Sequence, residues 1–327
     1  MERMKFIRGQ SMNFLIIGTG HISERLADAL LRLGITPYAV YSRSEASARE
    51  FCKKTSTARA YTSLTDALAD SRCEAVYVAS PTLLHKEHTI ASLLAGKHVL
   101  CEKALATSYA EYLDMRNCAD RCARVLLEAM RPAFDPITDE IARAVGKIGK
   151  IKSARLVFGQ YSSRYDAFKA GTVMNAFNPE MKNSALYDLG VYPIYMAVRL
   201  FGEPFDISSR SVYLENGFEG EGAITLFYEN FEVSVEYSKI RDMKSGGEIV
   251  GEGGTVSFDR INAPESLTVT DTLAEVSRAP VFPCENNMVY EAEAFINMVN
   301  GDSSYATHTE RSEAVMRLLD RAYPYAK

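Results

Sequence analysis

The stretch FLIIGTGHIS at residues 14–23 decides the fold of this chain. Its first four residues are a continuous apolar run, as expected of a parallel strand that is covered on both faces. After Gly18 and Gly20, apolar residues recur at helical spacing until Gly34 supplies a stop. A strand, a glycine turn and an amphipathic helix in this order indicate the first unit of a doubly wound parallel sheet.

The glycine turn nearly matches the pattern G-x-G-x-x-G/A. The first glycine permits a tight turn, and the second lets a pyrophosphate approach backbone N–H groups at the helix N-terminus. Ser23 stands where a third small residue is usual, and it still allows close packing of helix and strand. The alternative is a structural turn, because glycine pairs are common in loops. We expect the turn to bind a dinucleotide through Gly18, Thr19, Gly20, His21 and Ile22.

The first 130 residues alternate strand and helix, which favours an α/β fold. Further strands are predicted at 38–41, 75–79, 99–101 and 125–129, each a short apolar run. We therefore predict a Rossmann domain with a doubly wound parallel sheet over residues 12–131.

Past Arg131 the pattern changes to that of an α+β domain. Helices are predicted at 136–145 and 185–201, an extended stretch at 152–158, and six short strands between 208 and 271. Two helices, at about 286–299 and 309–322, close the chain. We expect residues 132–327 to form a second domain with a mostly antiparallel sheet, whose last helix could pack back on the first.

Composition excludes several classes of protein. The chain has 327 residues and a formal net charge of −5, without a basic stripe, so nucleic-acid binding is disfavoured. No apolar run approaches the roughly 20 residues that cross a bilayer. The start, MERMKFIRGQSM, lacks the apolar region of a secretory signal. We expect a cytoplasmic protein in which residues 1–11 are a disordered extension ahead of Met12.

The six cysteines show no paired metal spacing. Cys118 and Cys122 share a helical face, but no His or further Cys lies near them in sequence to complete a zinc site. We expect reduced thiols that serve as small apolar residues, and no metal.

The end of the second strand bears on the choice of dinucleotide. An acid near this point binds the ribose 2′-hydroxyl of NAD, whereas an arginine accommodates the 2′-phosphate of NADP. Here Ser42 can hydrogen-bond the phosphate and Arg43 can pair with it, although Glu45 follows two residues later. We expect NADP, with NAD as the alternative cofactor and a plain surface charge as the alternative reading of Arg43.

Two further groups follow strands at the carboxyl edge of the predicted sheet, where ligands of such sheets bind. Ser80 and Pro81 come directly after the strand at 75–79, and His85 could reach the nicotinamide side or cap the next helix. Glu102 and Lys103 directly follow the strand at 99–101. Hydride transfer to a carbonyl needs a proton for the nascent alkoxide and a nearby positive charge. Lys103 supplies the charge, and Glu102 would bind cofactor ribose or orient the lysine.

The segment YDLGVYPIY at 187–195 carries the second half of a candidate reaction centre. Asp188 and Tyr192 are four residues apart and share a helical face, and Gly190 leaves space where a cofactor ring could approach. A cation favours the anionic form of a phenol, so Tyr192 could act as general acid. Asp188 could bind a substrate hydroxyl or hold Lys103. The alternative is that these tyrosines only pack the helix.

At this point the chain resembles the Gfo/Idh/MocA family of oxidoreductases. The resemblance runs through FLIIGTGHIS, VYVASPTLLH (76–85), AGKHVLCEK (95–103), LLEAMRP (126–132), ALYDLGVYP (185–193) and YEAEAFINMV (290–299). It implies a Rossmann domain followed by a domain with a large, open, mainly antiparallel sheet, which often mediates dimers or tetramers.

Within this resemblance Lys103 matches the lysine of the motif E-K-P and Asp188 the acid of D-x-G-x-H. Ala104 replaces the motif's proline, and Tyr192 replaces its histidine. The latter is similar to the branch of dimeric dihydrodiol dehydrogenases and NADP-dependent sugar reductases, which uses a lysine and a tyrosine. The segment before Asp188 lacks the glycine run common in relatives.

The leading hypothesis is therefore an NAD(P)-dependent dehydrogenase or reductase that acts on a small CH–OH or carbonyl compound, such as a sugar, polyol or diol. It is expected to be a homodimer or homotetramer that binds neither nucleic acid nor membrane. The alternative is a dinucleotide-binding regulatory protein that kept the fold and lost turnover, and a lyase or hydrolase with tightly held NAD comes third. The loop at 161–182 is interpreted as substrate-side or as a plain connection.

Overall fold

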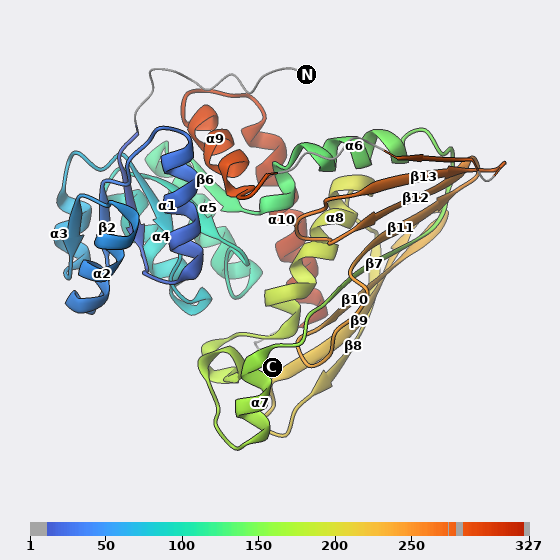
Figure 1. Cartoon of the computed structure of the whole chain (residues 1–327), viewed down its shortest axis with the longest axis horizontal. Helices are drawn as coiled ribbons and strands as arrows, with labels where there is room; N and C mark the ends of the chain where they lie inside the picture. Colours follow the sequence, from blue (N-terminus) through green and yellow to red (C-terminus); the bar gives the residue numbers. More distant parts are fainter. Residues whose placement is uncertain (1–11, 274, 279–283, 324–327) are drawn as a thin grey trace. The chain divides into compact units, whose positions relative to one another are not determined.

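The computed structural model describes residues 12–273, 275–278 and 284–323, so the expected extension at 1–11 lies outside the described residues. The chain divides into two compact units (Figure 1). The first is formed within Met1–Glu102, Leu113–Ala129 and Glu285–Tyr305, and the second within Lys103–Tyr112, Met130–Cys284 and Ala306–Lys327. The segment that follows the last strand of the second unit returns to the first unit as a helix.

The first unit is built on a parallel sheet of six strands in the order β3-β2-β1-β4-β5-β6. This is the doubly wound order of a dinucleotide-binding fold, which reverses between β1 and β4. The predicted Rossmann fold is confirmed. The strands are β1 (Phe14–Ile17), β2 (Ala39–Tyr41), β3 (Arg59–Tyr61), β4 (Ala75–Val78), β5 (His98–Glu102) and β6 (Leu126–Ala129).

Helices connect these strands, and several were not predicted. Both α2 and α3 begin after a serine whose hydroxyl accepts a backbone N–H: Ser44 from Ser47, and Ser63 from Asp66. These caps were the available signal, because the edge strand β3 between the two helices has two exposed residues and no apolar run. The helices are α1 (His21–Arg32), α2 (Glu45–Thr55), α3 (Leu64–Ala69), η1 (Thr82–Leu84), α4 (His85–Leu94), α5 (Tyr109–Cys122) and α9 (Met288–Val299).

The second unit contains a sheet of eight strands in the order β14-β13-β12-β11-β7-β10-β9-β8. Among the strands of this sheet that the structure describes, only β7 and β10 pair in parallel, so the sheet is mixed but mainly antiparallel, as expected. The edge strand β14 is short and exposed, and it was not predicted. The strands are β7 (Ile151–Gly159), β8 (Asp206–Tyr213), β9 (Glu219–Tyr228), β10 (Phe231–Ser238), β11 (Gly246–Gly251), β12 (Gly254–Asp259), β13 (Leu267–Asp271) and β14 (Val276–Arg278).

Helices cover one face of this large sheet (Figure 1). α8 (Val191–Phe201) packs on β7 and β10, and α6 (Pro136–Val145) packs on β12 and β13. The core residues Val233, Val235 and Tyr237 alternate along β10, as expected when one face of a strand is buried. The remaining elements of this unit are η2 (Arg131–Ala133), α7 (Ser163–Lys169), η3 (Asn175–Phe177), η4 (Pro179–Met181), η5 (Leu186–Gly190) and α10 (Tyr305–Ala322).

The predicted helix at 185–201 is not continuous. Its first turn, η5, is a π-helix, and α8 follows it directly. Single π-turns occur frequently at functional sites, and this one carries Asp188. The loop at 161–182 also contains a helix, α7, which its weak periodicity did not reveal.

Candidate active site

The glycine turn of the first unit fits a phosphate-bearing ligand. Gly18 has φ +114°, and an added Cβ would lie 2.7 Å from the carbonyl oxygen of Ala79 on the neighbouring chain segment. Gly20 differs, because no described atom lies within 4 Å of the position of its added Cβ. Helix α1 begins directly after Gly20 without a side-chain cap, so its first N–H groups remain for an anion. Ser23 is fully buried, which confirms the predicted close packing of helix and strand.

Beyond β2, Ser42 and Arg43 are placed differently. The Ser42 hydroxyl accepts a hydrogen bond of 3.3 Å from the backbone N–H of Ser44. Arg43 is exposed, and it forms no hydrogen bond or ion pair with the described residues. Glu45, the acid that favoured NAD, is exposed and accepts a hydrogen bond from Arg49. An unengaged guanidinium at this position can bind an anion.

The turn after β4 is held together by histidines. The His85 Nε2 donates to the carbonyl oxygen of Ser80 at 2.9 Å, and the His85 side chain is buried. His85 is the first residue of α4, whose start has no side-chain cap. His88, which sequence reasoning missed, places its Nδ1 2.9 Å from the Ser80 hydroxyl. Burial lowers the pKa of His88, and the charge of Arg43 acts in the same direction.

At the end of β5, Glu102 is buried against β4. The Tyr77 hydroxyl donates a hydrogen bond to Glu102 Oε1. Burial and the negative charge of Glu102 hold the pKa of Tyr77 well above its usual range. Lys103 follows Glu102 and precedes a cis peptide bond to Ala104.

In the second unit, Asp188 lies between two lysines. The Lys103 Nζ donates to Asp188 Oδ1 and to the Asp188 carbonyl oxygen, both at 2.8 Å. The Lys239 Nζ lies 2.8 Å from the other carboxylate oxygen, Oδ2. Burial alone would raise the pKa of Asp188, but the charges and hydrogen bonds of both lysines outweigh it and hold that pKa well below its usual range. Of the two roles predicted for Asp188, holding Lys103 is therefore the one seen in its contacts.

Tyr192 lies against the same group, with two cations near its ring. The Lys103 Nζ is 5.1 Å from the ring centroid, and the Arg131 Cζ is 5.9 Å from it. Arg131 also donates a hydrogen bond of 3.3 Å to the Tyr192 hydroxyl oxygen. The edge of Phe158 on β7 packs against the ring, with centroids 5.5 Å apart. The structure thus brings Lys103, Asp188 and Tyr192 together, as predicted.

Sequence reasoning missed Arg131 and Lys239. Arg131 stands in LLEAMRP, where it served only to mark a change of pattern, and Lys239 follows β10 outside any motif. The predicted role of Gly190 is wrong, because its added Cβ would lie 2.9 Å from the ring of Tyr237. The space at Gly190 is filled by a core side chain rather than left for a cofactor.

A buried carboxyl group on the large sheet binds the start of the π-turn. Glu219 on β9 is fully buried, and its Oε2 accepts a hydrogen bond of 2.9 Å from the backbone N–H of Leu186, the first residue of η5. Burial raises the pKa of Glu219 to about 7, although the hydrogen bonds from Leu186, Tyr237 and Ser184 act against it. The turn that carries Asp188 is therefore anchored to the large sheet.

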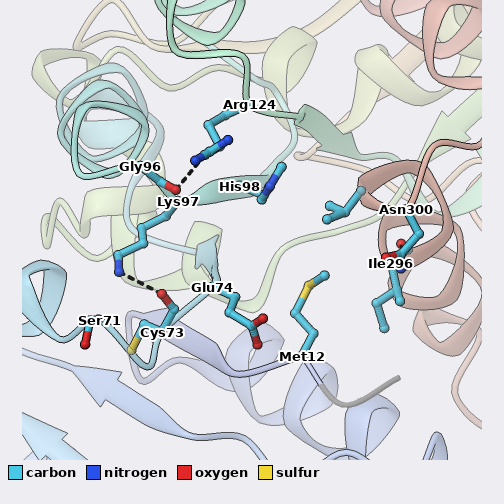
Figure 2. Close-up of a pocket in the computed structure, with 11 residues that line it drawn as sticks. Met12, Ser71, Cys73, Glu74, Gly96, Lys97, His98, Arg124, Ile296 and Asn300 are labelled. Atoms are coloured by element: carbon cyan, nitrogen blue, oxygen red, sulfur yellow. Dashed lines mark hydrogen bonds between the residues drawn. The ribbon is translucent and has the colours of Figure 1, made fainter. Parts of the chain in front are cut away.

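A hollow of about 560 Å³ lies at the opposite, amino-terminal edge of the parallel sheet (Figure 2). Its lining includes Glu74, Lys97 and Arg124, which precede β4, β5 and β6. The Lys97 Nζ donates to the carbonyl oxygens of Asp70 and Cys73, at 2.9 and 2.7 Å. Arg124 Nε donates to that of Gly96 at 2.6 Å. Both cations of this hollow therefore donate to backbone carbonyl oxygens.

Two negative findings apply to the described part of the chain. No group of three or more His, Cys, Asp or Glu residues there could hold a metal ion. None of its helices combines the length and apolar character needed to span a membrane.

The six cysteines are free thiols.

Two family models match most of the chain. Residues 12–129 match the model of an oxidoreductase family with an NAD-binding Rossmann fold, GFO_IDH_MocA, and residues 142–257 match the GFO/IDH/MocA C-terminal domain. The chain is 38% identical to scyllo-inositol 2-dehydrogenase (NADP(+)) of Bacillus subtilis over 95% of this chain and 96% of the relative. It is 31% identical to trans-1,2-dihydrobenzene-1,2-diol dehydrogenase of Danio rerio over 94% of each chain.

Solved structures show the same fold. A 3-ketoreductase from Actinomadura kijaniata, solved with NADP and TDP-benzene, superposes with a TM-score of 0.83 at 20% identity over 96% of this chain and 98% of that one.

Proposed function

The chain belongs to the GFO/IDH/MocA family of oxidoreductases, and we propose on this premise that it uses NADP to transfer a hydride to or from a sugar, polyol or diol. It is an NAD(P)-dependent dehydrogenase or reductase acting on CH–OH groups. Within this reaction we assign the assistance of proton transfer to Lys103 and Tyr192. The observation that carries the assignment is the convergence of Lys103 and Arg131 on Tyr192.

The hydrogen bond from Arg131 leaves the proton of Tyr192 available. A guanidinium N–H can only donate, so the Tyr192 oxygen accepts this hydrogen bond and its own O–H is not used in it. In the reductive direction, Tyr192 would give this proton to the substrate oxygen as the carbonyl carbon is reduced. In the oxidative direction, it would take the proton back. The positive charges of Lys103 and Arg131 stabilise the phenolate that exists between these steps.

Asp188 supports this chemistry through Lys103. It binds the Lys103 ammonium with one carboxylate oxygen and the backbone carbonyl, so the position of the ammonium is fixed by two hydrogen bonds. A group held in this way loses little freedom when the substrate arrives, which favours reaction.

The residues of the first unit fit NADP, which when bound supplies or accepts the hydride. Gly18, Thr19, Gly20, His21 and Ile22 would hold the pyrophosphate at the start of α1. Ser42 and Arg43 would bind the 2′-phosphate. Ser80, Pro81, His85 and Glu102 follow or end strands at the carboxyl edge of the sheet, where we place the nicotinamide half. NAD is the alternative cofactor.

The substrate class follows from the relatives. One curated relative carries the name of an inositol dehydrogenase, another that of a dihydrodiol dehydrogenase, and a third that of a D-xylose 1-dehydrogenase (NADP(+)) from Hypocrea jecorina. The compounds in these names all carry hydroxyl groups on neighbouring carbon atoms. We propose a polyhydroxylated small molecule for this chain, and a homodimer or homotetramer as its assembly.

A substrate screen tests the proposal. The protein is mixed with NADP and a panel of sugars, polyols and diols, and with NADPH and the matching carbonyl compounds, and the reduced nicotinamide absorbance is followed. Lys103→Met and Tyr192→Phe should each abolish turnover, by about 100-fold or more, while NADPH binding stays measurable. Tyr195→Phe, a change to another buried tyrosine of α8, is the matched control and should retain turnover.

Two results would contradict the proposal in different ways. Near-normal rates in Lys103→Met or Tyr192→Phe would refute the assigned roles. Tight binding of NADPH without turnover across the panel would favour the regulatory alternative.

A further inference from the structure

Lys239 is the most completely desolvated of the cations in the candidate site. Its side chain is 5% exposed, and that of Lys103 is 15% exposed. The side chain of their shared partner Asp188 is 37% exposed. Among the described residues, Asp188 is the single acid within ion-pair distance of Lys239. A buried ammonium is costly unless it is paired and hydrogen-bonded, so this lysine depends on Asp188.

The other contacts of Lys239 come from the loop at 161–182 and from the sheet. Its Nζ donates to the carbonyl oxygen of Ala176 at 3.2 Å. It also lies 5.3 Å from the ring centroid of Phe177 and 5.6 Å from that of Phe218. Phe177 and Phe218 are fully buried and pack together in the cluster that holds the loop. The lysine therefore links the loop to the carboxylate that holds Lys103.

Asp188 divides its two oxygens between the lysines. Oδ2 faces Lys239 and Oδ1 faces Lys103, so a quarter turn of the carboxylate would weaken both ion pairs together. One negative charge is shared by two positive charges, which leaves a net positive charge beside Tyr192. Arg131 adds a further positive charge at Tyr192, so loss of one lysine would lower this excess by one charge.

We infer that Lys239 is a positioning residue for the reaction, which fixes the carboxylate of Asp188 and thereby sets the place and the charge balance of Lys103. This inference rests on the proposed function. Lys239 acts on the reacting atoms through Asp188 and Lys103, and it ties their geometry to the loop segment Asn175–Phe177.

The inference has an electrostatic consequence that packing alone would not produce. The titratable and charged groups that face one another here are Lys103 after β5, Arg131 on η2, Asp188 on η5, Tyr192 on α8 and Lys239 after β10. Without the positive charge of Lys239, Asp188 would pair with Lys103 alone, which favours the charged form of the Lys103 ammonium. We assign the basic limb of the pH–rate profile to Lys103, and that limb should therefore move to higher pH.

The test compares the Lys239→Met and Lys239→Gln variants, which remove the charge, with Lys239→Arg, which keeps it. Lys169→Met is the control, because Lys169 on α7 also lies over two aromatic rings and pairs with an aspartate, which is Asp166 rather than Asp188. The pH dependence of kcat and of kcat/KM is measured for each. In parallel, the Lys103 side chain is titrated by NMR of ¹³C-labelled lysine in the full chain, with its signal assigned from Lys103→Met.

The neutral variants are expected to lower kcat by about 10-fold, to change KM less, and to move the basic limb and the Lys103 titration upward together. Lys239→Arg should leave the basic limb in place, with a reduced kcat because the guanidinium cannot reproduce the geometry. Lys169→Met should behave as the wild type.

Three results would overturn the inference. The first is a neutral variant that folds and shows an unmoved limb and an unmoved Lys103 titration. The second is wild-type kinetics in Lys239→Arg, should neither neutral variant fold. The third is an upward shift of the same size in Lys169→Met. If the wild type turns over no substrate, the proposed function fails, and the Lys103 titration alone then decides the inference.

Discussion

Replacement of Glu219 by glutamine should make the protein more stable at neutral pH, although it removes a native carboxylate. Glu219 is fully buried on β9, and its pKa is raised by burial to about 7 from an ordinary value of 4.5. In the unfolded chain this group loses its proton near pH 4.5, and in the folded chain it does so near pH 7. The folded state therefore binds the extra proton, and its stability falls as the pH rises between these values.

The size of the effect follows from the shift in pKa. Each pKa unit is worth about 1.4 kcal/mol, so the wild type loses about 3 kcal/mol of stability once the pH exceeds 7, relative to a chain with a neutral group there. At pH 5 the loss is about 1 kcal/mol. This pH is only slightly above the pKa of Glu219 in the unfolded chain, so little of the free energy that ionisation gives the unfolded chain has yet been gained. Glutamine keeps the carbonyl oxygen that accepts the N–H of Leu186 and does not titrate.

The assay is urea unfolding of wild type and Glu219→Gln between pH 5 and pH 8, followed by far-UV circular dichroism. The free energy of unfolding of the variant should exceed that of the wild type by an amount that grows with pH, from about 1 to about 3 kcal/mol. The control is Glu221→Gln on the same strand, whose carboxylate accepts two hydrogen bonds from Arg241 and whose pKa is lowered by them. That variant should be less stable than the wild type, with a difference that stays nearly constant over this range.

Parallel pH dependences for wild type and Glu219→Gln would refute this reasoning. They would mean that Glu219 is ionised in the folded protein as readily as in the unfolded chain. A variant less stable than the wild type at pH 8 would show that the charged form makes favourable contacts that outweigh its burial.

Three further substitutions concern residues of the expected cofactor site. We expect the wild type to bind NADPH at least 10-fold more tightly than NADH, since the exposed guanidinium of Arg43 can pair with the 2′-phosphate. Arg43→Ala should erase most of this preference. An unchanged ratio of the two Kd values would exclude that role. Gly18→Ala should destabilise the fold by about 1–3 kcal/mol, because its φ of +114° and the nearby Ala79 oxygen oppose a Cβ. Gly20→Ala should leave the unfolding curve unchanged and weaken NADPH binding, because its Cβ would point into open space that we assign to the pyrophosphate; equal effects of both changes on stability would contradict this distinction.

Most of the fold could be predicted from local patterns. A strand buried on both faces and a helix buried on one have different apolar periods, so runs such as that before Gly18 identify elements without knowledge of their neighbours. Where the period was weak or short, prediction failed. The edge strands β3 and β14 have too few buried residues to leave a pattern, and a single π-turn differs from α-helix over only five residues. The serine caps of α2 and α3 are sequence signals of a helix start, and the predicted elements did not include these two helices.

The candidate site divides in the same way. Lys103 at the end of a strand, and Asp188 and Tyr192 at helical spacing, could be recognised because each stands in a motif whose local geometry is known. Arg131 and Lys239 could not, because nothing near them in sequence distinguishes them from surface cations. They meet Tyr192 and Asp188 only because the segment after β6 and the end of β10 pack against η5 and α8.

The motifs were therefore sufficient for the reaction class, and the charge balance of the site required the folded chain. Periodicity and turn chemistry act over a few residues, and they are written into the order of the amino acids. Burial arises only when segments that are far apart in sequence pack together and exclude water. The same holds for ion pairs between residues far apart in sequence, such as Asp188 and Lys239. For that reason no local pattern indicated the buried carboxyl of Glu219 or the second ion pair of Asp188, with Lys239.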